Sequence, residues 1–130
     1  MSIKYTVTIE KFAEKHYLKS FHKKYKKSFN IPWSAFLLML QKFDLMLERD
    51  GNNKISNPSK EIVICKTEFK IAVNESAKSS GNRCVVAQDK EKKEIKILLV
   101  YCKNDIQESN ETVWWKKKIK ENYFDYEKLL

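Results

Sequence analysis

Cationic side chains and one tyrosine gather in the second half of the sequence, in segments that alternate like β-strands. Lys66 and Lys70 are four residues apart, so in one extended strand both point to the same face. Arg83 begins the next predicted strand, and Tyr101 and Lys103 share a face at the end of the following one. A guanidinium can bind a phosphate bidentately, lysines can move protons or neutralise developing charge, and an aromatic ring can stack on a base. Together these groups could cleave a phosphodiester without a metal ion.

A second interpretation of the same residues is a solvated sheet surface with polar strand ends. In either interpretation, Lys78, in the Ser- and Asn-rich segment 74–81, adds a further positive charge. The sequence spacing is compatible with both interpretations, so both stay open at this point.

Other catalytic and metal-binding schemes find little support in the sequence. His16 and His22 are six residues apart on one predicted helix and therefore face different directions. Cys65, Cys84 and Cys102 lie in predicted strands without metal-ligand spacing, which is typical of small buried side chains in a reducing compartment. No hydrolase elbow, phosphate-binding glycine loop or acidic metal cluster is present. We therefore expect no metal and no cofactor.

The composition indicates one basic domain over residues 1–130. Lys and Arg number 26 against 17 Asp and Glu, a formal net charge of +9, and 42% of the residues are hydrophobic. That hydrophobic content supports a core, and the excess positive charge favours a polyanionic partner such as RNA. The N-terminal segment has no apolar targeting core, and no apolar run is long enough to span a bilayer. We therefore expect a cytoplasmic protein that does not bind a membrane.

Hydrophobic periodicity predicts a small α+β fold in the order β-α-α-β-β-β-α, an antiparallel sheet packed by a helical hairpin and a C-terminal helix. Residues 30–32, Asn-Ile-Pro, should separate the two hairpin helices, because proline disfavours helical geometry in the residue before it. Ser109 is the expected N-cap of the last helix. The predicted strands cover 4–9, 62–73, 83–88 and 94–102, and the predicted helices cover about 10–29, 33–47 and 110–123.

Two segments then carry a resemblance to a known family. Residues 80–86, Ser-Gly-Asn-Arg-Cys-Val-Val, are followed by a charged turn and by residues 98–105, Leu-Leu-Val-Tyr-Cys-Lys-Asn-Asp. This order resembles the C-terminal half of the RelE/HigB-like toxins of type II toxin–antitoxin systems, part of the RelE/ParE superfamily. In that family a glycine-containing loop precedes the arginine, and the central strand ends in Tyr-x-Lys-Asn. The similarity covers roughly residues 69–119.

The resemblance implies a ribosome-dependent, metal-independent mRNA endonuclease that uses the substrate's 2′-hydroxyl as nucleophile. By position, Arg83 would stabilise the scissile phosphate and Tyr101 would stack on or orient a base. Lys70 and Lys103 would complete the catalytic set. The implied partners are a cognate antitoxin, the ribosome and mRNA, and the expected RNA-binding lysines are Lys66, Lys78, Lys19, Lys23 and Lys27.

Departures from the family pattern keep two rivals open. Ala72 stands where the family commonly has a second arginine, and Asn82 replaces a loop glycine. The last helix is unusually aromatic, with Trp115, Ile119 and Tyr123 predicted on one apolar stripe. Trp114 lies beside this stripe and is the suspected exposed contact for RNA or antitoxin. The rivals are a ParE-like gyrase inhibitor of the same fold and a non-catalytic basic module that binds RNA or another partner.

Overall fold

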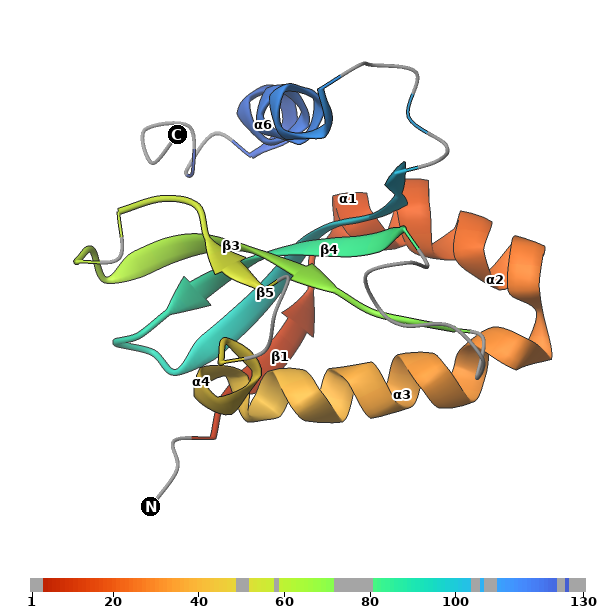
Figure 1. The fold of residues 1–130 in the computed structure, drawn as a ribbon, viewed down its shortest axis with the longest axis horizontal. Helices are drawn as coiled ribbons and strands as arrows, with labels where there is room; N and C mark the ends of the chain where they lie inside the picture. The colour runs from red at the N-terminus through yellow and green to blue at the C-terminus, as the bar shows by residue number, and fades with distance from the viewer. Residues whose placement is uncertain are drawn as a thin grey trace.

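The computed structural model describes residues 4–48, 52–57, 59–71, 81–103, 106, 110–123 and 126 (Figure 1). A twisted sheet lies in the middle of the molecule, with α3 along one side and α6 along the other. The predicted residues Lys78, Ala72 and Ser109 lie outside the described residues.

Five strands form the sheet in the order β1-β5-β4-β3-β2. The β2–β3, β3–β4 and β4–β5 pairs are antiparallel, whereas β1 pairs with β5 in parallel. The α+β fold class is confirmed, but the sheet is mixed rather than wholly antiparallel. The helices carry the chain from β1 at one edge to β2 at the opposite edge, and the antiparallel strands β2 to β5 then bring it back beside β1, with β5 in the same direction as β1. The strands are β1 (Thr6–Ile9), β2 (Asn53–Lys54), β3 (Ile62–Glu68), β4 (Asn82–Asp89) and β5 (Glu94–Cys102).

The predicted helical hairpin is present, but its break was placed wrongly. Helix α3 runs without interruption through Pro32, and the chain turns instead at Lys26, whose φ of 53° and ψ of −131° are not helical. Proline removes one backbone hydrogen bond from α3. Buried Phe29 and Trp33 on either side of it hold the helix against the sheet. The helical segments are α1 (Lys11–Ala13), the π-helical η1 (Glu14–Leu18), α2 (Lys19–Tyr25), α3 (Lys27–Gln41), α4 (Phe43–Met46) and α6 (Glu111–Asn122).

Each face of the sheet carries its own hydrophobic core. The first core joins side chains of α1 to α4, including Phe36 and Leu40, to strand residues such as Ile97. The second core packs Trp115 and Ile119 of α6 against the opposite face. Residues 97–100 of β5 are fully buried, as expected for a central strand covered on both sides.

The N-cap of helix α6 lies one residue later in the sequence than predicted. Asn110 is the N-cap, and its side-chain Oδ1 accepts a hydrogen bond of 3.2 Å from the backbone N–H of Val113. This satisfies one of the free donors at the start of the helix. The predicted stripe of Trp115, Ile119 and Tyr123 is buried against the sheet. The last helix therefore lies over the face of the sheet opposite α3 (Figure 1).

Candidate functional site

Three side chains from neighbouring strands form a row across the face of the sheet that α6 covers. Arg83 of β4 is the register partner of Glu68 on β3 and of Tyr101 on β5. Directly opposed residues of antiparallel strands point to the same face, so the guanidinium lies between a carboxylate and a phenol. Two of the sequence-predicted catalytic residues, Arg83 and Tyr101, are therefore neighbours.

A β-bulge brings Tyr101 to this face. Val85 pairs with Leu99 and Val86 pairs with Ile97, so Leu98 is an extra residue in β5. Before the bulge Ile97 packs in the core under α1 to α4, and after it Leu99 and Tyr101 pack under α6. Because strand side chains alternate, the same sequence in a regular strand without the bulge would place Tyr101 on the face of Ile97, away from Arg83.

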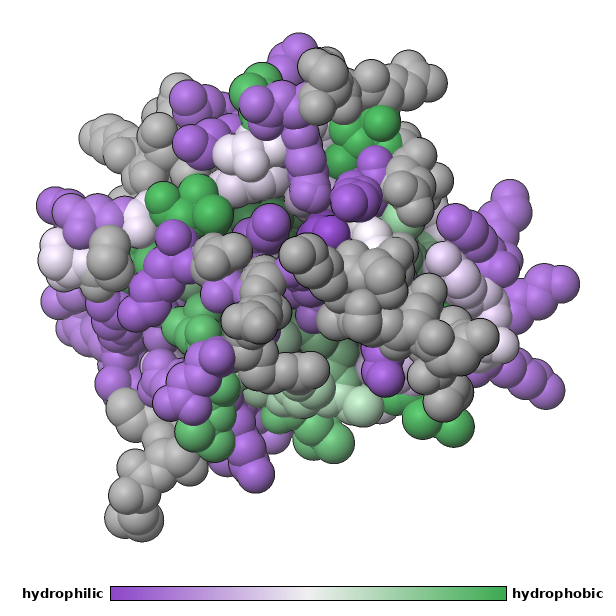
Figure 2. Space-filling view, in the orientation of Figure 1, coloured by the Kyte–Doolittle hydropathy of each residue, from purple (hydrophilic) through white to green (hydrophobic). Residues whose placement is uncertain are grey.

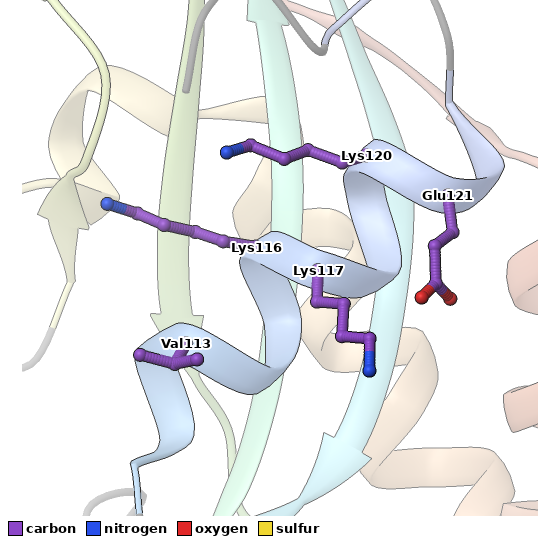
Figure 3. Close-up of a pocket in the computed structure, with 5 residues that line it drawn as sticks. All are labelled: Val113, Lys116, Lys117, Lys120 and Glu121. Atoms are coloured by element: carbon purple, nitrogen blue, oxygen red, sulfur yellow. The ribbon is translucent and has the colours of Figure 1, made fainter.

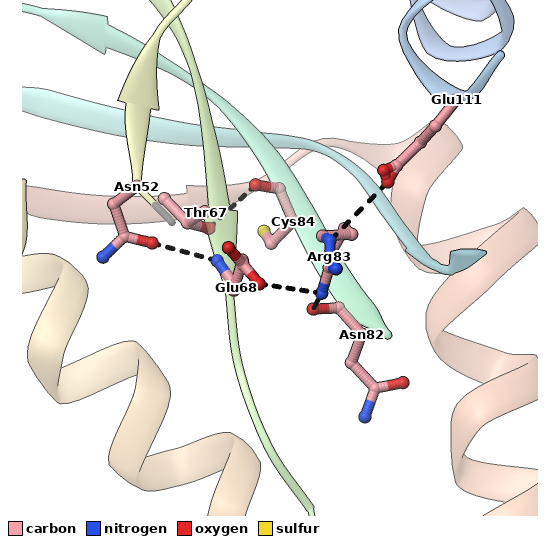
Figure 4. Close-up of polar contacts among 7 residues, drawn as sticks. All are labelled: Asn52, Thr67, Glu68, Asn82, Arg83, Cys84 and Glu111. Atoms are coloured by element: carbon pink, nitrogen blue, oxygen red, sulfur yellow. Dashed lines mark hydrogen bonds and ion pairs between the residues drawn. The ribbon is translucent and has the colours of Figure 1, made fainter. Parts of the chain in front are cut away.

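Arg83 is buried and held by two carboxylates (Figure 4). Its Nη1 lies 3.1 Å from Glu68 Oε2 and donates a 3.1 Å hydrogen bond to the carbonyl of Asn82. Its Nε lies 3.6 Å from Oε1 of Glu111, in the first turn of α6. The three charges, +1 from Arg83 and −1 from each of Glu68 and Glu111, sum to −1, so this arrangement as it stands does not attract a phosphate.

The backbone around Arg83 is fixed by buried hydrogen bonds. Glu68 donates its backbone N–H to Asn52 Oδ1 at 3.0 Å, which ties β3 to the segment after α4. Thr67 Oγ1 donates to the carbonyl of Cys84 at 2.8 Å, which joins β3 to β4 beside the arginine (Figure 4). These contacts hold Glu68 and Arg83 in register, so the guanidinium has a defined position.

Tyr101 is buried beside Arg83, with Trp114 of α6 packed edge-to-face on its ring at a centroid distance of 4.9 Å. Its hydroxyl has no hydrogen-bond partner among the described residues. Burial raises the pKa of Tyr101, the nearby Glu111 carboxylate raises it further, and the positive charge of Arg83 lowers it by less. The phenol is therefore neutral near pH 7 and can donate a proton to a hydrogen bond.

A pocket of about 230 Å³ lies beside Tyr101, between the helical hairpin and the end of β5. Aromatic rings form much of its wall, and Tyr17 packs edge-to-face on Trp114 at 6.4 Å. The pocket is smaller than sites for drug-sized ligands and is suited to one planar group. Its lining is His16, Tyr17, Ser20, Phe21, Val100, Tyr101, Cys102, Ile106 and Trp114.

The predicted lysines occupy different positions in the structure. Lys70 is exposed and follows the end of β3, so the expected single strand through Lys66 and Lys70 stops at Glu68. Lys66 is half-buried within β3. Lys103 is exposed, and its backbone N–H donates to the carbonyl of Gly81 at 2.8 Å, a contact that closes the end of the β4–β5 pair. Any residue except proline could make this backbone contact, so a catalytic role of the Lys103 side chain stays a prediction.

Two further groups of lysines are exposed on helices. Lys19 and Lys23 of α2 and Lys27 at the start of α3, three of the lysines expected to bind RNA, are exposed. Helix α6 carries a second cationic surface, where Val113, Lys116, Lys117, Lys120 and Glu121 line a depression of about 430 Å³ (Figure 3). The side chains of Lys116 and Lys120 extend from the same side of α6.

Sequence reasoning missed Glu68 and Glu111, because neither belongs to a motif. The sequence indicates them only indirectly. Glu68 is two residues after Lys66, so both point to the same face of the strand, and Glu111 falls in the first turn of a predicted helix. Trp114, suspected as an exposed contact, is half-buried against Tyr101.

The cysteines are unsuited to nucleophilic chemistry. All three are buried thiols that form no disulfide within the described residues. Burial raises the pKa of the Cys65 thiol to about 12 and also raises the pKa of Cys84. Within the described part of the chain, no cluster of His, Cys, Asp and Glu is arranged to hold a metal ion, and no helix is long and apolar enough to cross a bilayer.

The strand order, the helical hairpin and the α6 cover define a RelE-like α+β fold. One solved structure with this fold is a chain of the archaeal RelE–RelB complex from Pyrococcus horikoshii OT3, which superimposes with a TM-score of 0.55 at 16% sequence identity. The match covers 82% of this chain and 100% of that chain. No protein-family model matches the sequence, and no curated protein matches it. At this identity the similarity establishes the fold alone.

Proposed function

We propose that this chain is the toxin of a type II toxin–antitoxin system and cleaves mRNA on the ribosome in the cytoplasm. The observation that carries the proposal is the placement of Arg83 and Tyr101 as direct neighbours on one face of a RelE-like sheet. In the archaeal structure the protein is in complex with RelB, which supports an antitoxin as the partner of this chain. The basic surfaces on α2 and α6 would bind phosphates of ribosomal RNA and mRNA.

The proposed reaction is a transesterification within the RNA chain. The 2′-oxygen of the ribose attacks the adjacent phosphorus and loses its proton, the bond from phosphorus to the 5′-oxygen breaks, and that oxygen takes up a proton. The products are a 2′,3′-cyclic phosphate and a 5′-hydroxyl. Arg83 would bind the non-bridging oxygens, on which negative charge develops. Tyr101 would place the flanking base in the aromatic pocket beside it, where Trp114 and Tyr17 supply further stacking surface.

This reaction requires Arg83 to exchange Glu111 for phosphate. Glu111 is on α6, whereas Glu68 is part of the sheet, so a small displacement of the first turn of α6 is sufficient to free one side of the guanidinium. Removal of Glu111 changes the local charge from −1 to 0, and the basic surface of α6 then favours the incoming RNA.

The test is induction of the chain in a bacterial host, followed by mapping of mRNA 5′ ends. We expect growth arrest and codon-phased cuts in the wild type, with both lost in Tyr101→Ala and Arg83→Lys. Arg83→Lys keeps the charge opposite Glu68 but loses bidentate binding. Lys60→Ala, an exposed substitution outside the site, is the matched control, and circular dichroism of each purified variant confirms that it is folded.

A second candidate function is favoured by the ion pairs of Arg83. A buried arginine paired with two carboxylates is also typical of a residue that only stabilises the fold. A chain in which Arg83 has that role would act by binding a partner, without catalysis. Arrest with intact mRNA and induced DNA-damage signalling would indicate a gyrase-directed toxin. RNA binding without arrest would indicate a non-catalytic module and would contradict both toxin proposals.

A further inference from the structure

Three large apolar side chains are exposed on α3 and α4, in the second half of the helical hairpin. Ile31 is 81% exposed, Leu38 is 62% exposed and Leu45 is 52% exposed. Single exposed hydrophobic residues are ordinary on protein surfaces, whereas a spatially continuous set marks an interaction site. We call these three residues the α3 stripe.

The spacing of the α3 stripe is seven residues and then seven again. Seven residues are close to two full helical turns, so Ile31 and Leu38 lie on the same side of α3. Leu45 follows on the short helix α4, beyond the non-helical Lys42. The opposite side of α3 provides Phe29, Trp33, Phe36 and Leu40 to the core. Helix α3 is therefore apolar on two sides, and within the described part of the chain one of them is packed in the core while the other is exposed.

The space-filling view shows the same surface from outside. Hydrophobic side chains appear along the lower edge of the molecule, where α3 and α4 run in the ribbon view (Figure 2). Between the large residues the helix exposes only the small side chains of Ser34 and Ala35. A repeat of large apolar residues with small residues between them is the pattern that another helix packs against, with its own side chains between the exposed ones.

The charges around the α3 stripe define the partner's chemistry. Lys27 lies four residues before Ile31, and Lys42 lies four residues after Leu38, so a lysine flanks the pair at each end. Helix α3 contains no aspartate or glutamate. Acidic residues occur only at the α4 end of the described stripe, where Asp44 accepts a hydrogen bond of 3.1 Å from the Tyr5 hydroxyl and Glu48 is exposed. The basic surroundings therefore belong to the α3 part, around Ile31 and Leu38. A helix with acidic residues beside its apolar positions would complement this surface.

The same charges argue against two other occupants. A second copy of this chain would bring the flanking lysines of both stripes together, and each copy carries a formal net charge of +9. A nucleic acid would pair with the lysines but would leave Ile31, Leu38 and Leu45 against phosphate and water. We propose that the α3 stripe is a docking surface for an acidic amphipathic helix of a partner protein.

This inference does not depend on the proposed ribonuclease activity. The α3 stripe belongs to the layer that packs beneath the sheet, whereas Arg83 and Tyr101 face α6 on the opposite side. A partner could therefore be bound on α3 while the candidate site keeps its own contacts. Loss of mRNA cleavage would count against the proposed function and would leave the docking surface intact.

A synthetic helical peptide of about three heptads, with leucine at the a and d positions and glutamate at the flanking positions, is the probe. Fluorescence anisotropy of the labelled peptide measures its affinity for the full chain. We expect Leu38→Asp and Ile31→Asp to weaken binding by at least about tenfold, because each places a carboxylate opposite leucine. Both positions are exposed, so both variants should keep the melting temperature of the wild type.

Val113→Asp is the matched control, because Val113 is 56% exposed but lies on α6. It should leave peptide affinity unchanged. Lys42→Glu should weaken binding of the acidic peptide. A peptide with lysine in place of glutamate should bind the wild type poorly. The inference is overturned if the acidic peptide does not bind, if Leu38→Asp binds it as well as the wild type does, or if the basic peptide binds equally. Self-association abolished by Leu38→Asp would assign the surface to a second copy instead.

Discussion

Glu111 Oε1 lies 3.6 Å from Arg83 Nε, so the first turn of α6 is attached to the centre of the candidate site. Glu68 already neutralises the guanidinium from the sheet, with Oε2 at 3.1 Å from Nη1. The second carboxylate is therefore in excess of what charge balance needs. A carboxylate in the first turn is stabilised by the helix dipole, which accounts for its position without any need for Arg83. In the proposed reaction, Glu111 is the group that the phosphate would replace.

Glu111→Gln should strengthen RNA binding at little cost in stability. The substitution removes one negative charge beside Arg83 and retains a side chain of the same shape. We expect affinity for a short single-stranded RNA to rise about fivefold near 0.1 M salt, about 1 kcal/mol, and the free energy of unfolding to fall by less than about 1 kcal/mol. Fluorescence anisotropy and urea denaturation measure the two quantities. Glu48→Gln, exposed after the end of α4 and outside both the site and the α6 depression, is the control for a general charge effect. Equal gains in both variants would contradict a specific role for Glu111.

Glu68→Ala should destabilise the protein strongly. The substitution leaves a 4% exposed guanidinium with Glu111 as its remaining carboxylate, at the longer distance of 3.6 Å. Breaking a buried ion pair from one side costs about 3–5 kcal/mol. Urea denaturation should show this loss as a lower midpoint at an unchanged m-value. The comparison variant is Lys96→Ala, which breaks the more exposed Lys96–Glu94 pair at 4.0 Å and should cost less than about 0.5 kcal/mol. Similar losses in the two variants would show that the Arg83 pair is solvated.

Much of the fold could be predicted from hydrophobic periodicity. Strand β5 has the predicted bounds, and the Trp115–Ile119–Tyr123 stripe lies against the sheet as expected. The hairpin turn was placed wrongly because proline was taken as the break, whereas packing on the sheet holds α3 together through Pro32. The parallel pairing of β1 could not be read from its alternation, since both pairing directions have the same period.

The candidate site was predictable only in part. Arg83 and Tyr101 were identified by residue type and order. Whether their side chains lie next to each other depends on the β-bulge at Leu98 in β5. Every residue from 97 to 100 is apolar, so no alternation reveals where the bulge lies. The ion pair with Glu111 joins segments 28 positions apart in the sequence, 83 to 111, and depends on how α6 docks. Charge and spacing along a chain do not contain that information.

Tyr101 should contribute to the loss of stability in alkaline solution. Burial raises its pKa above the ordinary value of 10.0, so the folded protein keeps a proton that the unfolded chain releases. Stability is then complete below about pH 10 and falls as the pH rises, by about 1.4 kcal/mol per pH unit for one such group. Tyr101→Phe removes this dependence, so its unfolding free energy should fall less steeply above pH 10. At pH 7 it should be at least as stable as the wild type, because the hydroxyl has no partner among the described residues.

Urea denaturation at a series of pH values measures that slope. Absorbance of ionised tyrosine at alkaline pH should also show one fewer late-titrating group in Tyr101→Phe. The pKa values of Tyr5, Tyr17 and Tyr123 are raised as well, so the variant keeps a residual slope. Identical slopes for variant and wild type would show that Tyr101 is open to solvent.

Lys26→Gly should stabilise the protein, although it adds glycine between two helices. Lys26 has φ 53° and ψ −131°, a region that a residue with a Cβ atom enters only with strain. Glycine enters this region freely, which outweighs the greater entropy that it loses on folding. We expect the free energy of unfolding to rise by about 1 kcal/mol, measured by urea denaturation. Lys23→Gly is the matched control, since Lys23 is exposed within α2, where glycine should cost about 0.5–1 kcal/mol. A rise in the free energy of unfolding for Lys26→Gly and a fall for Lys23→Gly would locate the hairpin turn at Lys26. A fall for both variants would place the turn elsewhere.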